Sequence, residues 1–233
     1  MMNWRAPISF LSSLDFFAVA LIILCWLGLT LLIENAPKKH PSVSKLMAEH
    51  RRGWMMQMIK RDPRIVDSQT LASLRQGTAF FTSATMLAIG GGLALIANPD
   101  QLEGVVSDLA NTQAPVIVWD MKILFVLLFL TNAFLKFVWS HRLFGYCHIL
   151  VAAVPTEPQD KNAIPLAEKA AQINISAGRS YNRGLRSVYF GLASCAWLVG
   201  PEALIGTTLL TLTVMMRREF ASHSRAVLLM DRE

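Results

Sequence analysis

Four long apolar stretches dominate this sequence and limit the folds that it can adopt. They cover residues 16–33, 77–97, 123–139 and 187–216. A helix needs roughly 20 apolar residues to cross the hydrocarbon core of a bilayer, which is about 30 Å thick. The chain is 53% hydrophobic and 16% charged, whereas soluble domains carry roughly 25% charged residues. These features predict a helical integral membrane protein and exclude a soluble enzyme, a disordered chain and a disulfide scaffold.

The last apolar stretch is divided by Gly200-Pro201. Proline cannot continue a helix interior, and a preceding glycine favours a turn. Each half is short of a full crossing unless polar flanks extend both helices, with Arg186 and Arg217 reaching to the headgroups. We expect two true spans, and the alternative is a re-entrant hairpin. The predicted fold is an all-α polytopic bundle of about five spans, or four plus a re-entrant hairpin, in one domain over residues 1–233.

Positive charge is concentrated in alternate segments of the chain. Residues 34–76, residues 141–186 and the C-terminal tail are rich in lysine and arginine, whereas residues 98–117 contain neither and hold three acidic residues. Cytoplasmic loops of membrane proteins carry an excess of lysine and arginine. The pattern predicts a multi-pass protein of the cell inner (cytoplasmic) membrane, with its N-terminus outside and its C-terminus in the cytoplasm. Long helices are expected to extend into the cytoplasm.

Two cytoplasmic segments are predicted to be helical. In residues 42–61, apolar side chains recur on one face at helical spacing. This amphipathic segment either lies in the inner-leaflet interface or packs on the cytoplasmic face of the bundle. Residues 162–184 are rich in alanine, and this helix can continue into the fourth span. Topology and anionic lipids of the inner leaflet explain the net charge of +6 without a nucleic-acid partner.

Three arginines near the predicted cytoplasmic boundary are candidates for a binding site. Arg179, Arg183 and Arg186 follow one another at i, i+4 and i+7, which places their guanidinium groups on one helix face. Such a face can bind phosphate, carboxylate or another anion, and the alternative is simple anchoring at lipid headgroups. Lys136 lies inside the third apolar run, where an ionisable group is a candidate for a solute pathway. It can also extend to the inner interface.

The sequence contains no signature of catalysis or of a bound cofactor. A phosphate-binding loop, an HExxH pair, a GxSxG elbow and a dinucleotide fingerprint are all missing. His141 and His148 share a helix face, but both lie at or beyond the inner boundary, which does not suit haem between spans. The three cysteines are scattered. We therefore expect no catalytic residue, no cofactor and no metal ion.

Several spaced polar residues give the chain a resemblance to a known family. They fall in four blocks: Phe137-Val-Trp139-Ser-His-Arg142-Leu-Phe-Gly-Tyr146-Cys147, Asn182-Arg-Gly184-Leu-Arg186-Ser-Val-Tyr189-Phe190, Ala196-Trp197 with Gly200-Pro201, and Arg217-Arg218-Glu219-Phe220 with Ser222. Over most of its length the chain resembles the uncharacterised membrane family called domain of unknown function five-nine-nine. His141 and Gly145 depart from the pattern of that family. The resemblance implies a multispanning protein and adds no substrate.

The resemblance also draws attention to polar residues near the cytoplasmic boundary of the last three spans. In addition to Arg186 they are Arg142, Asn182, Tyr189, Arg218 and Glu219. We expect these residues to form one polar cluster, in which Glu219 pairs with Arg142 or Arg186.

Three functional hypotheses follow from the sequence. The first is a homo-oligomeric channel- or transporter-like protein for a small anionic solute. The negative charge of the solute is inferred from the arginines at positions 179, 183 and 186. The second is an accessory or scaffold subunit that binds anionic lipids of the inner leaflet and a larger membrane complex. The third is an enzyme acting on lipid headgroups, although we do not expect catalysis. The expected partners are membrane lipids and either further copies of the chain or another membrane protein.

Overall fold

The computed structural model describes residues 10–98 and 115–230, and every regular element in these ranges is a helix. The elements are α2 (Ser13–Glu34), α3 (Val43–Met58), α4 (Ile65–Ala97), α6 (Val116–Ala153), α7 (Ala163–Ser194), the 3-10 helix η1 (Cys195–Leu198), α8 (Pro201–Phe220) and α9 (His223–Leu229). This confirms the predicted all-α fold. The break at Gly200-Pro201 is also confirmed, since η1 ends before it and α8 begins at the proline.

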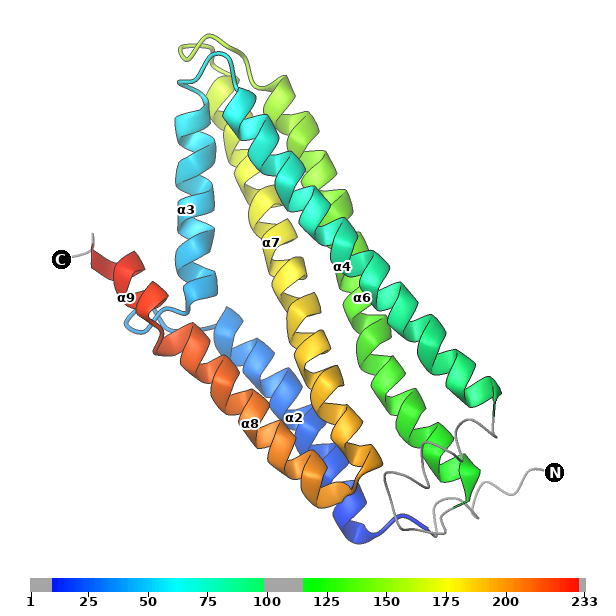
Figure 1. The fold of residues 1–233 in the computed structure, drawn as a ribbon. Coiled ribbons are helices and arrows are strands. Elements are labelled where there is room, and N and C mark those ends of the chain that lie inside the picture. Colours follow the sequence, from blue (N-terminus) through cyan, green and yellow to red (C-terminus); the bar gives the residue numbers. More distant parts are fainter. Residues whose placement is uncertain (1–9, 99–114, 231–233) are drawn as a thin grey trace.

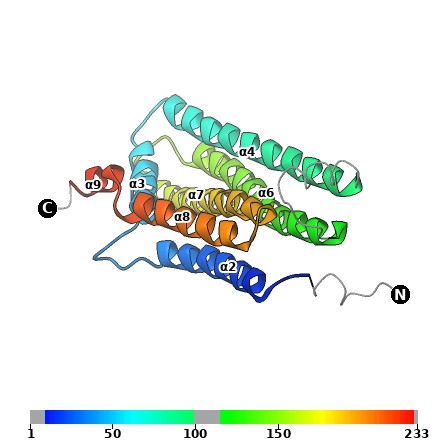
Figure 2. The same cartoon turned by 60° about the horizontal axis from the view of Figure 1, so that its bottom comes forward.

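The helices form two tiers along a common axis. The long helices α4, α6 and α7 run through both tiers, while α2 and α8 flank the lower tier and α3 flanks the upper one (Figure 1). Figure 2 shows α4 and α2 on opposite sides of the bundle, with α6, α7 and α8 between them. The most extensive helix interface is that of α6 with α7. The α6–α7 pair is therefore the central packing unit of the fold.

Three of the described helices are long and apolar enough to cross a membrane, namely α2, α4 and α6. The predicted fourth and fifth spans correspond to the second part of α7 and to α8, which are not among these three. The membrane character of the chain is therefore supported by α2, α4 and α6. The number of five spans stays a prediction.

Each tier has its own core. In the lower tier, α2, α6, α7 and α8 bury Ile22, Phe129, Phe190 and Leu204 against one another. In the upper tier, methionines of α3 pack with Phe144 of α6 and with the alanines of α7. Most of the predicted amphipathic segment 42–61 forms α3, which packs along α7 (Figure 1).

A serine closes the connection between α2 and α3, which separates the tiers. The Ser42 hydroxyl accepts a bond of 3.3 Å from the Lys45 backbone N–H and so caps α3. The same hydroxyl donates to the Ile33 carbonyl at 2.8 Å, one of the last carbonyls of α2. Both helix ends are therefore held at one point, and the first turn of α3 lies beside the end of α2.

Candidate anion-binding site

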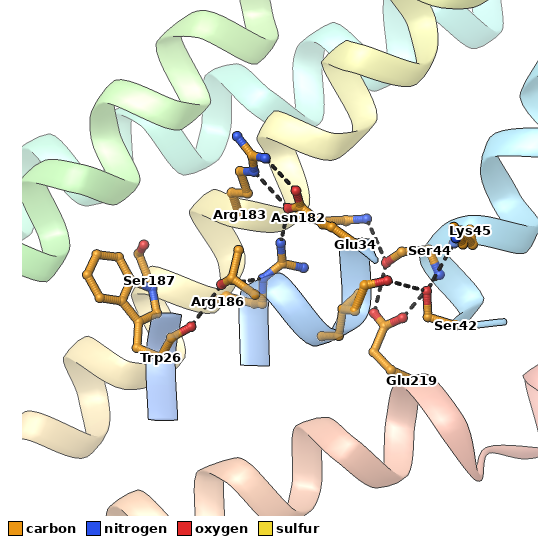
Figure 3. A network of polar contacts seen from close by, with 12 residues as sticks. Trp26, Glu34, Ser42, Ser44, Lys45, Asn182, Arg183, Arg186, Ser187 and Glu219 are labelled. Carbon is orange, nitrogen blue, oxygen red and sulfur yellow. Dashed lines mark hydrogen bonds and ion pairs between the residues drawn. The ribbon is translucent and has the colours of Figure 1, made fainter. Parts of the chain in front are cut away.

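Glu34, the last residue of α2, forms ion pairs with two arginines of α7 (Figure 3). Arg183 binds both carboxylate oxygens, with Nε donating to Oε1 at 2.7 Å. Arg186 donates from Nη2 to Oε1 at 2.8 Å. The two arginines are three residues apart, which places them on one face of α7. The i+3 spacing in the sequence therefore brings two cations to one carboxylate.

Arg186 is the most deeply buried charge of this group. Its side chain is 2% exposed, whereas that of Arg183 is 39% exposed. Besides Glu34 it has the Thr30 hydroxyl, which accepts from its Nε at 3.2 Å. Glu34 and Thr30 lie one turn apart on α2. A buried guanidinium needs such partners, because burying an unpaired charge costs several kcal/mol.

Glu219 near the end of α8 is held by the first turn of α3. Its carboxylate accepts from the Ser44 backbone N–H at 3.1 Å and from the Ser44 hydroxyl at 3.0 Å. The Asn182 amide of α7 donates to the Ser44 hydroxyl at 3.4 Å. The backbone N–H groups of a first helical turn have no partner within the helix and favour a negative charge. This contact ties α8 to α3 and α7 (Figure 3).

A pocket of about 330 Å³ opens between α3, α7 and α8 beside these two carboxylates. Its lining contains two acidic side chains, Glu34 and Glu219, and five cationic ones, Lys45, Arg51, Arg179, Arg186 and Arg218. Both carboxylates already accept hydrogen bonds from protein groups. The excess of positive charge makes the pocket suited to an anion.

Arg51 enters the pocket from α3 and is held in place by three neighbours. Its Nη1 donates to the Asn174 side-chain carbonyl, and its Cζ lies 5.8 Å from the centroid of the Phe144 ring. Its guanidinium also lies over Gly178, where a Cβ atom would be 3.0 Å from the Arg51 Cζ. Burial lowers the pKa of Arg51, but guanidinium groups in proteins stay charged.

Arg218 reaches the pocket from α8. Its Nη1 donates to the Tyr189 hydroxyl at 2.9 Å, and its Cζ lies 5.7 Å from the centroid of the tyrosine ring. The ring thus orients the guanidinium by a hydrogen bond and by a cation–π contact. Arg179 of α7 is exposed and lines the same pocket. Guanidinium groups from three different helices therefore border one space.

The family model described as "Protein of unknown function, DUF599" matches residues 17–224. The chain belongs to this family. The match covers every element that borders the basic pocket, from the end of α2 to Glu219. No curated protein and no solved structure matches the chain.

The structure gathers seven of the nine candidate residues predicted from the sequence. Around Glu34 and the pocket lie Arg179, Asn182, Arg183, Arg186, Tyr189, Arg218 and Glu219. Arg142 lies elsewhere on α6, where it is exposed, donates to the Tyr146 hydroxyl at 3.1 Å and lies over Trp139. Lys136, also on α6, is half-buried and does not line the pocket. Among the described residues Glu219 makes no direct ion pair with Arg142 or Arg186, because Arg186 binds Glu34 and Glu219 binds Ser44; the charge of Glu219 acts on Arg186 only through space.

Sequence analysis missed Glu34, Ser44 and Arg51. Glu34 carried a usable signal, since it is an acidic residue directly at the end of an apolar stretch and ahead of a basic loop. Arg51 carried none, because it is one of nine lysines and arginines in residues 34–76. Only the packing of α3 on α7 distinguishes it from its neighbours. Within residues 10–98 and 115–230, no group of three or more His, Cys, Asp or Glu side chains could hold a metal ion.

Proposed function

We propose that this protein is a subunit of a homo-oligomeric channel- or transporter-like assembly of the inner membrane for a small anionic solute. In this proposal the chain has five spans, its C-terminus is cytoplasmic, and the basic pocket is the anion site on the cytoplasmic side. The observation that carries the proposal is the pocket itself. Five cationic side chains and two already hydrogen-bonded carboxylates surround about 330 Å³, which falls within the usual range of small-molecule sites.

The core of the lower tier bears on the path that a solute would take. Apolar side chains of α2, α6, α7 and α8 pack against one another there, with only scattered buried polar groups such as Lys122 and Thr208, so a charged solute would meet a largely apolar interior in one subunit. In contrast, α4 leaves large apolar side chains exposed, among them Phe80, Met86 and Leu87. A route between subunits of a closed, symmetric oligomer agrees with both observations.

One observation favours the second hypothesis, a lipid-binding accessory or scaffold subunit. The pocket is lined by Glu34 at the end of α2 and by Arg218 and Glu219 near the end of α8. If α2 spans the bilayer, this is the depth of the inner-leaflet headgroups, whose phosphates suit an arginine cluster. We do not propose a lipid-headgroup enzyme, since both carboxylates of the pocket are already held by protein donors.

Flux through proteoliposomes tests the transport proposal. The purified protein would be assayed for uptake of chloride, sulfate, phosphate and small carboxylates, and its subunit count would be taken by native mass spectrometry. We expect uptake of at least one anion and a loss of tenfold or more in Arg218→Gln. Arg52→Gln is the matched control, because Arg52 pairs with Glu168 on the exposed face of α3 and α7.

The outcomes separate the hypotheses. A single closed oligomer with flux supports the channel or transporter. A folded oligomer that moves none of these anions contradicts it, and a fixed ratio to a different membrane protein favours the accessory subunit.

A further inference from the structure

We infer that the basic pocket binds a phosphate group, free or as a monoester, and that Arg51 of α3 is one of its ligands. The inference specifies the anion class of the proposed function and rests on that proposal.

The lining of the pocket carries more positive than negative charge, with five cationic side chains against the carboxylates of Glu34 and Glu219. Arg183 and Arg186 share the single carboxylate of Glu34. Lys45 donates to the Ala36 carbonyl, Arg51 to the Asn174 amide and Arg218 to the Tyr189 hydroxyl. These acceptors carry no formal charge. A carboxylate ligand would leave much of this charge uncompensated, whereas a phosphate dianion brings up to two charges and three strong acceptor oxygens.

Arg51 has the geometry of a ligand prepared in advance. Its guanidinium has five N–H donors in a fixed plane, and Asn174 accepts from Nη1. Asn174 is fully buried and donates in turn to the Cys147 sulfur at 3.5 Å. Phe144 and Gly178 hold the plane of the guanidinium from the two helices behind it. A side chain held in this way loses little rotamer entropy on binding, and this favours planar, bidentate recognition of phosphate.

Gly178 lies directly against this guanidinium and leaves little room for a side chain. A Cβ atom at this position would lie 3.0 Å from both Cζ and Nε of Arg51 and 3.2 Å from Nη2. These atoms belong to the rigid end of the guanidinium. An alanine at position 178 would therefore shift the Arg51 guanidinium by a few tenths of an ångström without removing any charge of the pocket.

The size of the pocket leaves two sources for the phosphate. A volume of about 330 Å³ is at the small end of ligand pockets and admits a phosphate with a short organic group. That group is either a soluble phosphomonoester or the headgroup of an anionic lipid at the inner leaflet. Both present the same chemistry to the arginines.

The experiment measures binding to the full-length protein in a phosphate-free detergent buffer. Isothermal titration with inorganic phosphate, glycerol phosphate and acetate gives the class of anion. We expect at least tenfold tighter binding of the two phosphates than of acetate. Arg51→Gln is expected to weaken phosphate binding tenfold or more, and Arg52→Gln to leave it unchanged.

Gly178→Ala provides a second, charge-neutral variant. It is expected to weaken phosphate binding severalfold in the wild-type background. In the double variant with Arg51→Gln it is expected to weaken binding no further than Arg51→Gln alone. Unfolding temperatures without phosphate check that the variants are folded. If Arg51→Gln does not fold, Arg51→Lys replaces it, because it keeps the charge and removes the planar fork.

The source of the phosphate is tested separately, in nanodiscs of phosphatidylcholine with and without phosphatidic acid. Retention of phosphatidic acid by the nanodisc sample that depends on Arg51 assigns the site to a lipid headgroup. Phosphate flux into proteoliposomes that depends on Arg51 assigns it to a soluble ligand. Equal affinity for acetate and phosphate, or an unchanged affinity in both Arg51→Gln and Gly178→Ala, overturns the inference. Phosphate binding without any flux removes the transport proposal and keeps the inference. Chloride or carboxylate flux without phosphate binding overturns the inference and keeps the transport proposal.

Discussion

Glu34 supplies the carboxylate that compensates the charges of two arginines on α7. It accepts from Arg183 and Arg186 at the point where the two tiers meet. Removing one partner of a buried ion pair leaves an uncompensated charge, and this costs more than the pair itself contributes. The exposed fraction of Arg186 is only 2%, so water cannot take over the role of the carboxylate without a local rearrangement.

We expect Glu34→Gln to lower the free energy of unfolding by about 3–5 kcal/mol, the range for breaking a buried pair. The measurement is an unfolding midpoint of the purified protein in mild detergent. Adding Arg186→Met removes the buried charge and is expected to restore much of the stability.

The matched control is Glu168→Gln, which breaks the exposed pair with Arg52. Exposed pairs contribute less than about 1 kcal/mol, so this variant is expected to unfold close to the wild type. Similar losses for Glu34→Gln and Glu168→Gln would show that Glu34 does not hold a buried charge.

At the interface of α6 and α7, a glycine allows the two helices to approach closely. A Cβ atom on Gly184 would lie 2.6 Å from Cε1 of Phe137, a fully buried ring. One turn away on α6, the Ser140 hydroxyl donates to the Ala177 carbonyl at 2.8 Å. A glycine is thus needed at position 184, because the aromatic ring fills the space that a side chain would take.

We expect Gly184→Ala to destabilise the protein by about 1–3 kcal/mol, as for other overpacked cores. The double variant with Phe137→Leu is expected to recover part of this loss. Gly53→Ala on α3 is the control, because a Cβ atom there has nothing within 4 Å, and its expected effect is neutral or slightly stabilising. The readout is the same unfolding midpoint, and an unchanged midpoint for Gly184→Ala would contradict the close approach.

The contact of α3 with α7 also has a weak dependence on pH. A hydrogen bond from Gln172 and the nearby Arg52 lower the pKa of Glu168 below its usual range. The charged form is therefore favoured by folding, and its contribution is present at neutral pH and lost as pH falls through the lowered pKa. We expect the small stability difference between the wild type and Glu168→Gln at neutral pH to shrink progressively as pH falls below the ordinary pKa of a glutamate. A difference that grows on acidification would contradict this sign.

The molecule as a whole is longer than a bilayer is thick. α4 has 33 residues and α6 has 38, which at 1.5 Å per residue is ~50 and ~57 Å. The hydrocarbon core is only about 30 Å thick, whereas α2, with 22 residues, matches it at ~33 Å. The lower tier, where α2 lies, is therefore the part that we assign to the membrane.

Cysteine accessibility tests this assignment and the number of spans. The native cysteines Cys25, Cys147 and Cys195 would be replaced first, and single cysteines introduced at Val199, in the α7–α8 turn, or at Gln159, in the α6–α7 loop. For five spans we expect an impermeant thiol reagent outside the cell to label Val199→Cys only. Labelling of Gln159→Cys after the membrane is opened is the control.

A re-entrant hairpin gives a different result. Its turn would lie inside the bilayer, so Val199→Cys would resist labelling from outside the cell. Labelling of Gln159→Cys in intact cells would instead reverse the proposed orientation.

Much of the fold could be predicted, because apolar stretches and helix breakers act locally. The all-α class, the break before Pro201 and the membrane character all depend on residues close together in the sequence. The candidate site was predicted in part for the same reason, since Arg183 and Arg186 share a helix face whatever α7 packs against. Arg142 was included wrongly because nearness to a predicted boundary does not say on which side of α6 a residue lies.

The sequence by itself determined that this chain forms long helices, where they break and which loops are basic, since these properties follow from hydrophobicity, proline and charge along the chain. Only the tertiary structure decided that Glu34 meets Arg183 and Arg186, that Ser44 binds Glu219, and that Arg51 enters the pocket. These contacts join residues more than a hundred positions apart. They depend on the packing of α2 and α3 against α7 and α8, where volume and shape select one arrangement among many that the helical pattern allows.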